Sequence, residues 1–461
     1  LNGGAIESLS SNFSQWTMMS YVGRINYGLM DRYLLTASLR YDGSSRLSEG
    51  NKWALFPSAA IAWRITEEDF AKNLDWLSNL KLRFSYGQAG NTNSVSPYAS
   101  EGTISGSVYY PFGTSTSVGN LPANIANPML TWERTSEYNV GLDFGFLNQR
   151  IAGNIEYYNR TTNDLLMKRN IPVHLGYSSV TSNVGSVRNS GFELQLNTAN
   201  IMTKNFAWNT TINLAYNKNE IVSLADEEDL SNYSIHLQGM RGRYSDKRFI
   251  GKPVDTNWTQ NTIGVWQLGE EEEAAKYGCV PGNFKIKDYN NDGKLTDDDY
   301  IIDGKRTPDW TGGMTNMFKI YDFDFSFHMY FQAGATQYDR FFENFALEWN
   351  SQNFNNLRTN YWTPENPSNT MGRPSQMGSR GNIAYERTDF LKVSYITLGY
   401  TLNKRLMSKW GLDNARIYVT VQNPFILTKF RGLDPEQPDL TNIGDTDGMT
   451  MNALLGVNIS F

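Results

Sequence analysis

The chain has 461 residues, of which 40% are hydrophobic and 13% aromatic, and its formal net charge is -6. It contains no run approaching the roughly 20 apolar residues that a membrane-spanning helix needs, which excludes a helical membrane protein. The negative charge and the lack of a basic stripe exclude nucleic acid as a partner. A transmembrane β-barrel stays open, because its strands are only half apolar.

Apolar and polar residues alternate in many segments, as they do in strands with two different faces. In the last segment, Met451, Ala453, Leu455, Val457, Ile459 and Phe461 form one apolar row, opposite Asn452, Gly456, Asn458 and Ser460. The alternation predicts about thirteen strands, near 19–29, 33–41, 53–65, 81–88, 132–146, 150–160, 188–199, 206–217, 311–320, 323–333, 390–402, 416–427 and 449–461.

The connections between these segments alternate in length. They are short at 30–32, 147–149, 200–205 and 321–322, moderate at 66–80 and 403–415, and long at 89–131, 161–187, 218–310, 334–389 and 428–448. Short periplasmic turns and long extracellular loops are typical of outer-membrane barrels. A soluble sandwich or propeller is the alternative, but its strands cluster near five or six residues. We therefore predict an all-β fold, an antiparallel transmembrane β-barrel of the cell outer membrane, with the apolar rows facing the lipid bilayer.

The direction of the strands adds a further expectation. If 30–32 is a periplasmic turn, the first and the last strand run the same way and the count is odd, whereas bacterial barrels have an even number. We expect the remaining strands to lie outside this chain, and the stretch 241–266 to be a hairpin within the outer loop. Acidic residues followed by apolar ones at helical spacing predict a short periplasmic helix over 67–77, capped by Thr66.

One motif in the long loop 218–310 carries metal chemistry. Residues 288–299 match a twelve-residue calcium loop at positions one, three, five and six. The predicted ligands are Asp288, Asn290, Asp292, the backbone carbonyl of Lys294, and Asp299. Because Asp299 replaces the usual Glu, the ion is Ca²⁺ or Mg²⁺, in a structural role. The alternative is a solvated Asn-Asp-Gly turn.

The sequence singles out no catalytic residues. His174, His236 and His328 are scattered without a zinc-binding spacing, and His328 falls inside a strand pattern, which favours a wall residue. The single Cys279 has no activating partner nearby in the sequence. Aromatic residues in the outer loops either stack on sugar rings or pack the loops together, and packing is the favoured interpretation: Tyr109, Tyr110, Trp258 and Trp266. No substrate-binding residues are assigned.

Several spaced stretches resemble a known family. They are Tyr33 to Arg46, Phe56 to Arg64, Trp76 to Gly87, Asn189-Ser-Gly-Phe-Glu-Leu194, Asp288 to Gly293, Pro308-Asp-Trp-Thr-Gly-Gly313 and the terminal Phe461. Together they resemble the barrel of SusC-like TonB-dependent transporters of the Bacteroidota (RagA/SusC family). The likeness runs along almost the whole chain.

The resemblance implies a 22-stranded barrel closed by an N-terminal plug, of which residues 1–461 are the C-terminal part, without the plug and the TonB box. It implies import of glycan oligosaccharides or peptides, energy from the TonB complex, a SusD-like surface lipoprotein as partner, and no enzymatic activity. Two other functions stay open: a surface glycan-binding or glycan-cleaving β-protein, and a passive porin.

Overall fold

The computed structural model describes residues 13–461 except 172–173, 175, 178, 348–358, 375–378, 404–406, 408, 410 and 439–448. The predicted connections 161–187, 334–389, 403–415 and 428–448 therefore lie partly outside the described residues. No helix in the described part of the chain is long and apolar enough to cross a membrane.

Thirteen long strands of the described chain form one antiparallel sheet, in which each strand neighbours the next long strand in the sequence. Each of them lies at one of the thirteen segments that the alternation predicts. In order they are β1 (Met18–Leu29), β2 (Tyr33–Ser44), β3 (Trp53–Arg64), β4 (Leu77–Asn91), β7 (Glu133–Phe146), β8 (Ile151–Asn163), β11 (Ser186–Met202), β12 (Phe206–Ser223), β20 (Trp310–Ile320), β21 (Phe323–Ala333), β24 (Phe390–Thr401), β25 (Asn414–Thr428) and β26 (Asn452–Ser460).

The last strand has the two faces that the sequence predicts. Val457 lies opposite Ile417 of β25, and Leu455 lies opposite Val419, so the apolar rows of the two strands share a face. Leu455 is 75% exposed and Val457 is 55% exposed. Exposed apolar rows of this length are stable where lipid covers them, so the apolar face is the lipid face and the polar face lines the lumen.

The short turns use backbone conformations that match the twist of the strands. Met30 and Asp31, between β1 and β2, have φ values of 54° and 53°, and Tyr321, between β20 and β21, has φ 54°. Positive φ in a tight hairpin loop suits the right-handed twist of the flanking strands, although Asn and Gly are the usual residues there. The sheet therefore imposes these turns on residues that do not favour them.

The described residues group into two compact units, and long strands such as β4 and β8 contribute to both. The first unit comprises the described parts of residues 1–63, 83–139 and 159–188. Its short strands are β5 (Ile104–Phe112), β6 (Ser115–Pro122), β9 (Leu166–Asn170) and β10 (Ser179–Asn183). Its buried core is Leu47, Ala54, Phe56, Val95, Leu130, Trp132 and Leu166.

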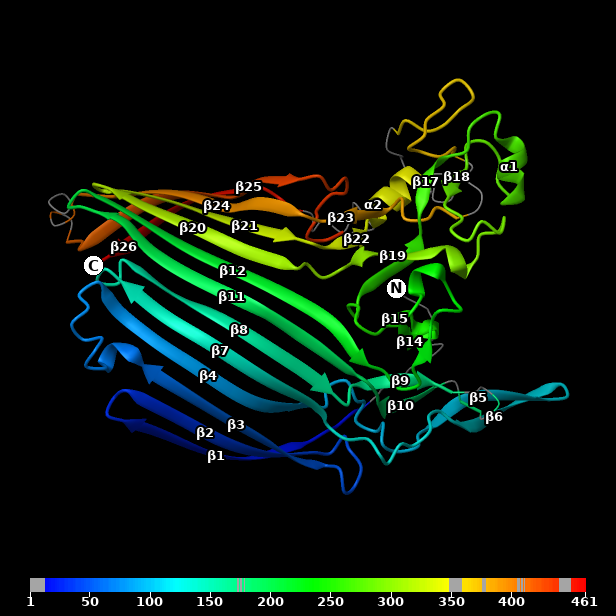
Figure 1. Ribbon diagram of the computed structural model, residues 1–461, viewed down its shortest axis with the longest axis horizontal. Coiled ribbons are helices and arrows are strands. Elements are labelled where there is room, and N and C mark those ends of the chain that lie inside the picture. Colours follow the sequence, from blue (N-terminus) through cyan, green and yellow to red (C-terminus); the bar gives the residue numbers. More distant parts are fainter. Residues whose placement is uncertain are drawn as a thin grey trace, which may run out of the picture. The chain divides into compact units, whose positions relative to one another are not determined.

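The second unit comprises the described parts of residues 64–82, 140–158 and 189–461, which include β12, β20, β21, β24, β25 and β26 and most of the short elements. Figure 1 shows the short strands and α1 gathered near one end of β20, β21, β24 and β25, away from the β20–β21 turn. The elements are β13 (Glu228–Asp229), β14 (Arg241–Arg243), β15 (Arg248–Phe249), β16 (Thr256–Gln260), β17 (Thr262–Val265), β18 (Phe284–Ile286), β19 (Tyr300–Lys305), β22 (Thr336–Tyr338), β23 (Tyr385–Arg387), α1 (Glu271–Lys276), α2 (Arg340–Phe342), a π-helical turn (Glu343–Leu347), and 3₁₀ turns at Ile65–Glu67, Ile235–Leu237, Tyr244–Asp246 and Asp297–Asp299. Three buried clusters hold its loops together.

Two expectations about local structure are wrong. The stretch 241–266 stays out of the large sheet, as expected, but it is not one hairpin: only β14 and β15 pair with each other, while β16 pairs with β19 and β17 pairs with β18. The stretch 67–77 forms turns after one 3₁₀ turn at Ile65–Glu67. A helix of this length needs packing to be stable. Phe70 and Trp76, which would have supplied its apolar face, are both exposed.

Candidate functional site

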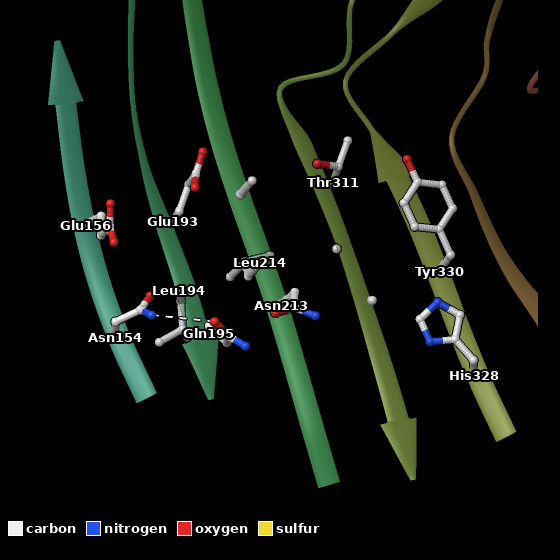
Figure 2. A pocket seen from close by; sticks show the side chains of 13 residues that line it. Asn154, Glu156, Glu193, Leu194, Gln195, Asn213, Leu214, Thr311, His328 and Tyr330 are labelled. Atoms are coloured by element: carbon white, nitrogen blue, oxygen red, sulfur yellow. Dashed lines mark hydrogen bonds between the residues drawn. The ribbon is translucent and has the colours of Figure 1, made fainter. Parts of the chain in front are cut away.

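A polar hollow lies on the second unit's part of the sheet, and we call it the wall hollow. Its volume is about 470 Å³, within the range of small-molecule sites. Strands β8, β11, β12, β20 and β21 contribute its lining (Figure 2). The lining residues are Asn154, Glu156, Glu193, Leu194, Gln195, Asn213, Leu214, Ala215, Thr311, Gly312, Gly313, His328 and Tyr330.

The wall hollow has a distinct chemistry at each side. Glu156 on β8 and Glu193 on β11 place two carboxylates at one side, while His328 and Tyr330 on β21 form the other (Figure 2). The amide of Asn154 donates to Gln195 Oε1 at 3.5 Å across β8 and β11. None of the described lining residues is Lys or Arg. The surface therefore offers hydrogen-bonding groups and two carboxylates.

His328 is held in place by its neighbours. Its Nδ1 and Thr315 Oγ1 share a hydrogen bond of 2.8 Å. Its ring stacks on Tyr395, with centroids 5.7 Å apart. A Cβ on Gly313 would lie 3.0 Å from the ring, so glycine makes room for it. His328 is a wall residue, which confirms the prediction from its strand pattern.

Two of the motifs that resemble the family meet on the other face of these strands. The Phe192 ring packs edge-to-face on Trp310, with ring centroids 5.3 Å apart. It also stacks on Tyr216, with ring centroids 5.7 Å apart. Gly191, next to Phe192, lies so close to β12 that a Cβ there would be 1.9 Å from the carbonyl oxygen of Tyr216. The motifs around Asn189 and Pro308 thus serve close packing of strands β11, β12 and β20.

The predicted metal ligands lie in one ordered loop. Both oxygens of Asp288 accept backbone hydrogen bonds, from Asn291 N at 2.6 Å and Gly293 N at 2.9 Å. Asp292 accepts from Lys294 N at 2.8 Å, and Asn290 accepts from Asp292 N at 3.1 Å. Asp299 is fully buried, and it accepts from the amides of Tyr289 and Thr296. These hydrogen bonds from the loop's own backbone amides hold the loop in its folded conformation.

The carboxylate of Asp288 is kept ionised. Burial acts to raise its pKa, but hydrogen bonds from Gly293, the Tyr277 hydroxyl and Asn291 outweigh burial and hold the pKa below its ordinary value. Tyr277 donates to Asp288 Oδ2 at 3.0 Å, and burial together with this bond raises the pKa of Tyr277 to about 12. An ionised carboxylate is the form that a hard cation binds.

The side chains do not by themselves assemble a metal cluster. Throughout the described chain, no group of three or more His, Cys, Asp or Glu side chains is arranged to hold a metal ion. Asp288, Asp292 and Asp299 are each turned toward backbone amides instead. The donor set is chemically suited to Ca²⁺ or Mg²⁺, and metal binding at 288–299 stays a prediction.

The four loop aromatics divide into two pairs. Trp266 is only 3% exposed and packs in a buried cluster with Ala274 and Cys279. Trp258 packs against Phe249 and Tyr300. Tyr109 and Tyr110 of β5 are 68% and 61% exposed, and Tyr110 contacts Phe112 of its own strand edge-to-face at 5.0 Å, so neither ring is packed into a core of the loops.

Comparison with known proteins agrees with this architecture. The model of the family described as "TonB dependent receptor-like, beta-barrel" matches residues 2–423. The chain belongs to this family of TonB-dependent receptors. It is 35% identical to the TonB-dependent receptor SusC of Bacteroides thetaiotaomicron, over 96% of this chain and 44% of that protein. It is 33% identical to TonB-dependent receptor P26 of Formosa agariphila, over 98% of this chain and 47% of that protein. Both relatives are named as TonB-dependent receptors.

Solved structures show the same fold. The structure titled "RagAB peptide importer in the 'open-open' state" superposes with a TM-score of 0.80 at 24% identity, covering 100% of this chain and 49% of that one. The receptor is thus SusC-like and lies in the outer membrane. The chain spans about half the length of the curated relatives that it matches.

Proposed function

We propose that this chain is part of an importer that moves oligosaccharides or peptides across the outer membrane, driven by TonB and assisted by a SusD-like surface lipoprotein. The observation that carries the proposal is the 35% identity to SusC over almost the whole chain. The polar face of the sheet, with the wall hollow, supports it, because carboxylates and amides hydrogen-bond both to hydroxyl groups and to peptide groups. Glycan and peptide remain the two substrate classes that this surface suits.

Energy dependence separates this function from that of a passive porin. In cells that express the full receptor, collapse of the proton-motive force or loss of TonB is expected to reduce substrate uptake to the level of a strain without the receptor. Uptake of a labelled oligosaccharide or peptide over minutes measures this. Uptake that continues unchanged without TonB points to a porin. Recovery of the protein in the soluble fraction, after the outer membrane is pelleted without detergent, points to a surface glycan-binding protein.

The charge of the wall hollow makes a second test. We expect a neutral oligosaccharide such as maltoheptaose to bind more tightly than an oligogalacturonate of equal length, because two carboxylates within about 7 Å of an anion cost on the order of 1 kcal/mol in a solvated site. That corresponds to about a fivefold difference in Kd. The double variant Glu156→Gln plus Glu193→Gln is expected to remove most of the difference, as measured by titration calorimetry.

The control for this test is Glu273→Gln, which changes an exposed carboxylate of α1 that pairs with Lys276. It is expected to leave the preference unchanged. Equal binding of both oligomers by the unmodified protein, or an equal effect of the control, contradicts a role for the wall hollow in selection by charge.

A further inference from the structure

A carboxyl group is buried between two outer loops. Asp339, directly after β22, is fully buried, and its Oδ1 accepts a hydrogen bond from Phe342 N at 2.9 Å at the start of α2. Its backbone N donates to Ala384 O at 2.8 Å. Its second oxygen, Oδ2, is buried without a hydrogen-bond partner among the described residues. An unpaired carboxylate oxygen in such a place is costly when ionised, whereas a protonated carboxyl is much cheaper to bury.

Residues 430–438, which follow β25, cover this carboxyl, and we call them the clasp. Gly432 lies directly on Asp339, since a Cβ there would be 2.9 Å from Oδ1. Phe430 is buried beside it. Arg431 N donates to Glu386 Oε2 at 3.0 Å, and Arg431 Nη2 donates to Ile383 O at 3.0 Å.

The clasp is held on both sides of Asp339. The guanidinium of Arg431 also lies 3.9 Å from the centroid of the Phe342 ring. Near its other end, Glu436 forms an ion pair with Lys392, and Pro438 O accepts from Arg340 N at 3.3 Å. These contacts hold the clasp over the Asp339 carboxyl.

The charged groups around Asp339 come from three segments. Glu386 of β23 disfavours its ionised form, and Arg431 of the clasp favours it. On the segment that contains Asp339, the Tyr338 hydroxyl donates a hydrogen bond to the carboxylate of Glu343. Burial outweighs the hydrogen bond from Phe342 N, and the pKa of Asp339 rises to about 6.

We propose that residues 430–438 form a pH-dependent clasp, which closes over protonated Asp339 and opens when that carboxyl ionises. The direction of the pH dependence follows from the protonation of Asp339. The closed form binds the proton more tightly than the open form, in which water reaches Asp339 and its pKa is near the ordinary 3.8. Closure is then most favourable at low pH and weakens as pH rises from about 4 to about 6, with little further change above that.

The size of the effect follows from the two pKa values. Each unit of difference between the pKa of Asp339 in the closed form and in the open form changes the opening constant tenfold. The full change in the opening constant is therefore about a hundredfold. Between pH 4.5 and 7.5 the opening constant is expected to rise roughly 25-fold, most of it below pH 6.5.

Hydrogen exchange of the purified receptor in detergent tests this. Protection of the peptide covering 429–438, corrected for the intrinsic exchange rate, is expected to fall roughly 25-fold from pH 4.5 to 7.5. Asp339→Asn keeps the cap acceptor and mimics the protonated group, so its protection should stay at the low-pH level throughout. Asp339→Ser also caps the helix without titrating, and it should show no pH dependence even if the clasp is looser.

Glu343→Gln is the matched control, because it removes a neighbouring carboxylate that does not cover Asp339. It is expected to keep the pH dependence of the unmodified protein. A flat profile in the unmodified protein overturns the proposal. So does a pH dependence that survives in Asp339→Asn or disappears in Glu343→Gln.

Discussion

Replacing Gly191 by Ala is expected to impair assembly of the sheet strongly. A Cβ at this position would lie 1.9 Å from the carbonyl oxygen of Tyr216 and 2.9 Å from the hydroxyl of Tyr158. Backbone cannot move aside as a flexible side chain can, so β11 and β12 have to separate. Overpacking of a well-packed site costs about 1–3 kcal/mol, and a backbone clash of this kind belongs at or above the upper end.

The consequence extends beyond the two strands. The Tyr158 hydroxyl donates to Asn217 Oδ1 at 2.9 Å, and Asn189 Oδ1 accepts from Asn219 at 2.9 Å. Phe192 packs on Trp310 of β20. Separation of β11 from β12 therefore disturbs polar and aromatic contacts on four strands, β8, β11, β12 and β20. We expect the free energy of unfolding to fall by about 3 kcal/mol or more.

The measurement is a urea titration of the receptor refolded in detergent, together with the yield of folded protein in outer membranes. Gly23→Ala in β1 is the matched control, because nothing lies within 4 Å of a Cβ at Gly23. It is expected to change stability by no more than about 0.5 kcal/mol. Equal stability of the two variants contradicts the close approach at Gly191.

Much of the large sheet is predictable from the sequence because its signal is local. A strand with one lipid face and one polar face alternates with period two, as in the row from Met451 to Phe461, and the thirteen strands lie where that pattern predicts them. The lengths of the connections add the second signal. The position of a strand within the sheet follows because each long strand pairs with the next one along the chain.

The outer loops are less predictable, because their pairing is not local. The stretch 241–266 has the composition of strands, but the partners of β16 and β17 lie about 20 to 50 residues further on, as in the pairing of Trp258 with Ile302. No periodicity within the stretch identifies such partners. The helix prediction for 67–77 fails for a different reason: the spacing favours a helix, but Phe70 is left 68% exposed and its burial does not stabilise one.

The wall hollow could not be located from the sequence either. Glu193, Gln195 and His328 sit at alternate positions on polar strand faces, like many other polar residues of the sheet. What distinguishes this position is the pair Gly312 and Gly313. Because these residues have no side chain, the side chains and backbone of the neighbouring strands approach β20 closely. The motif around Pro308 contains these glycines, so the resemblance marked the position without giving its physical role.

Removal of divalent cations is expected to expose the loop 288–299. The side-chain oxygens of Asp288, Asn290 and Asp292 accept hydrogen bonds from backbone N–H groups of the loop. A bound cation would turn these oxygens toward itself. A ligand at one hundred times its Kd stabilises the bound form by about 2.7 kcal/mol. Cleavage within 267–310 by a protease that acts on the open loop should then be about a hundredfold faster in EDTA, and added Ca²⁺ should reverse it.

Three variants distinguish stabilisation of the loop by a bound ion from stabilisation by its hydrogen bonds. Asp288→Ala plus Asp292→Ala removes two predicted ligands and their hydrogen bonds to the backbone, so cleavage should be fast with or without EDTA. Lys294→Ala is the matched control, because the predicted ligand there is the backbone carbonyl and the side chain is exposed. It should keep the full response to EDTA. Asp299→Ala removes the buried carboxylate that accepts from Tyr289 and Thr296, and it should abolish the response. Equal cleavage of the unmodified protein with and without EDTA means that the loop holds no ion and that its amides alone maintain its fold.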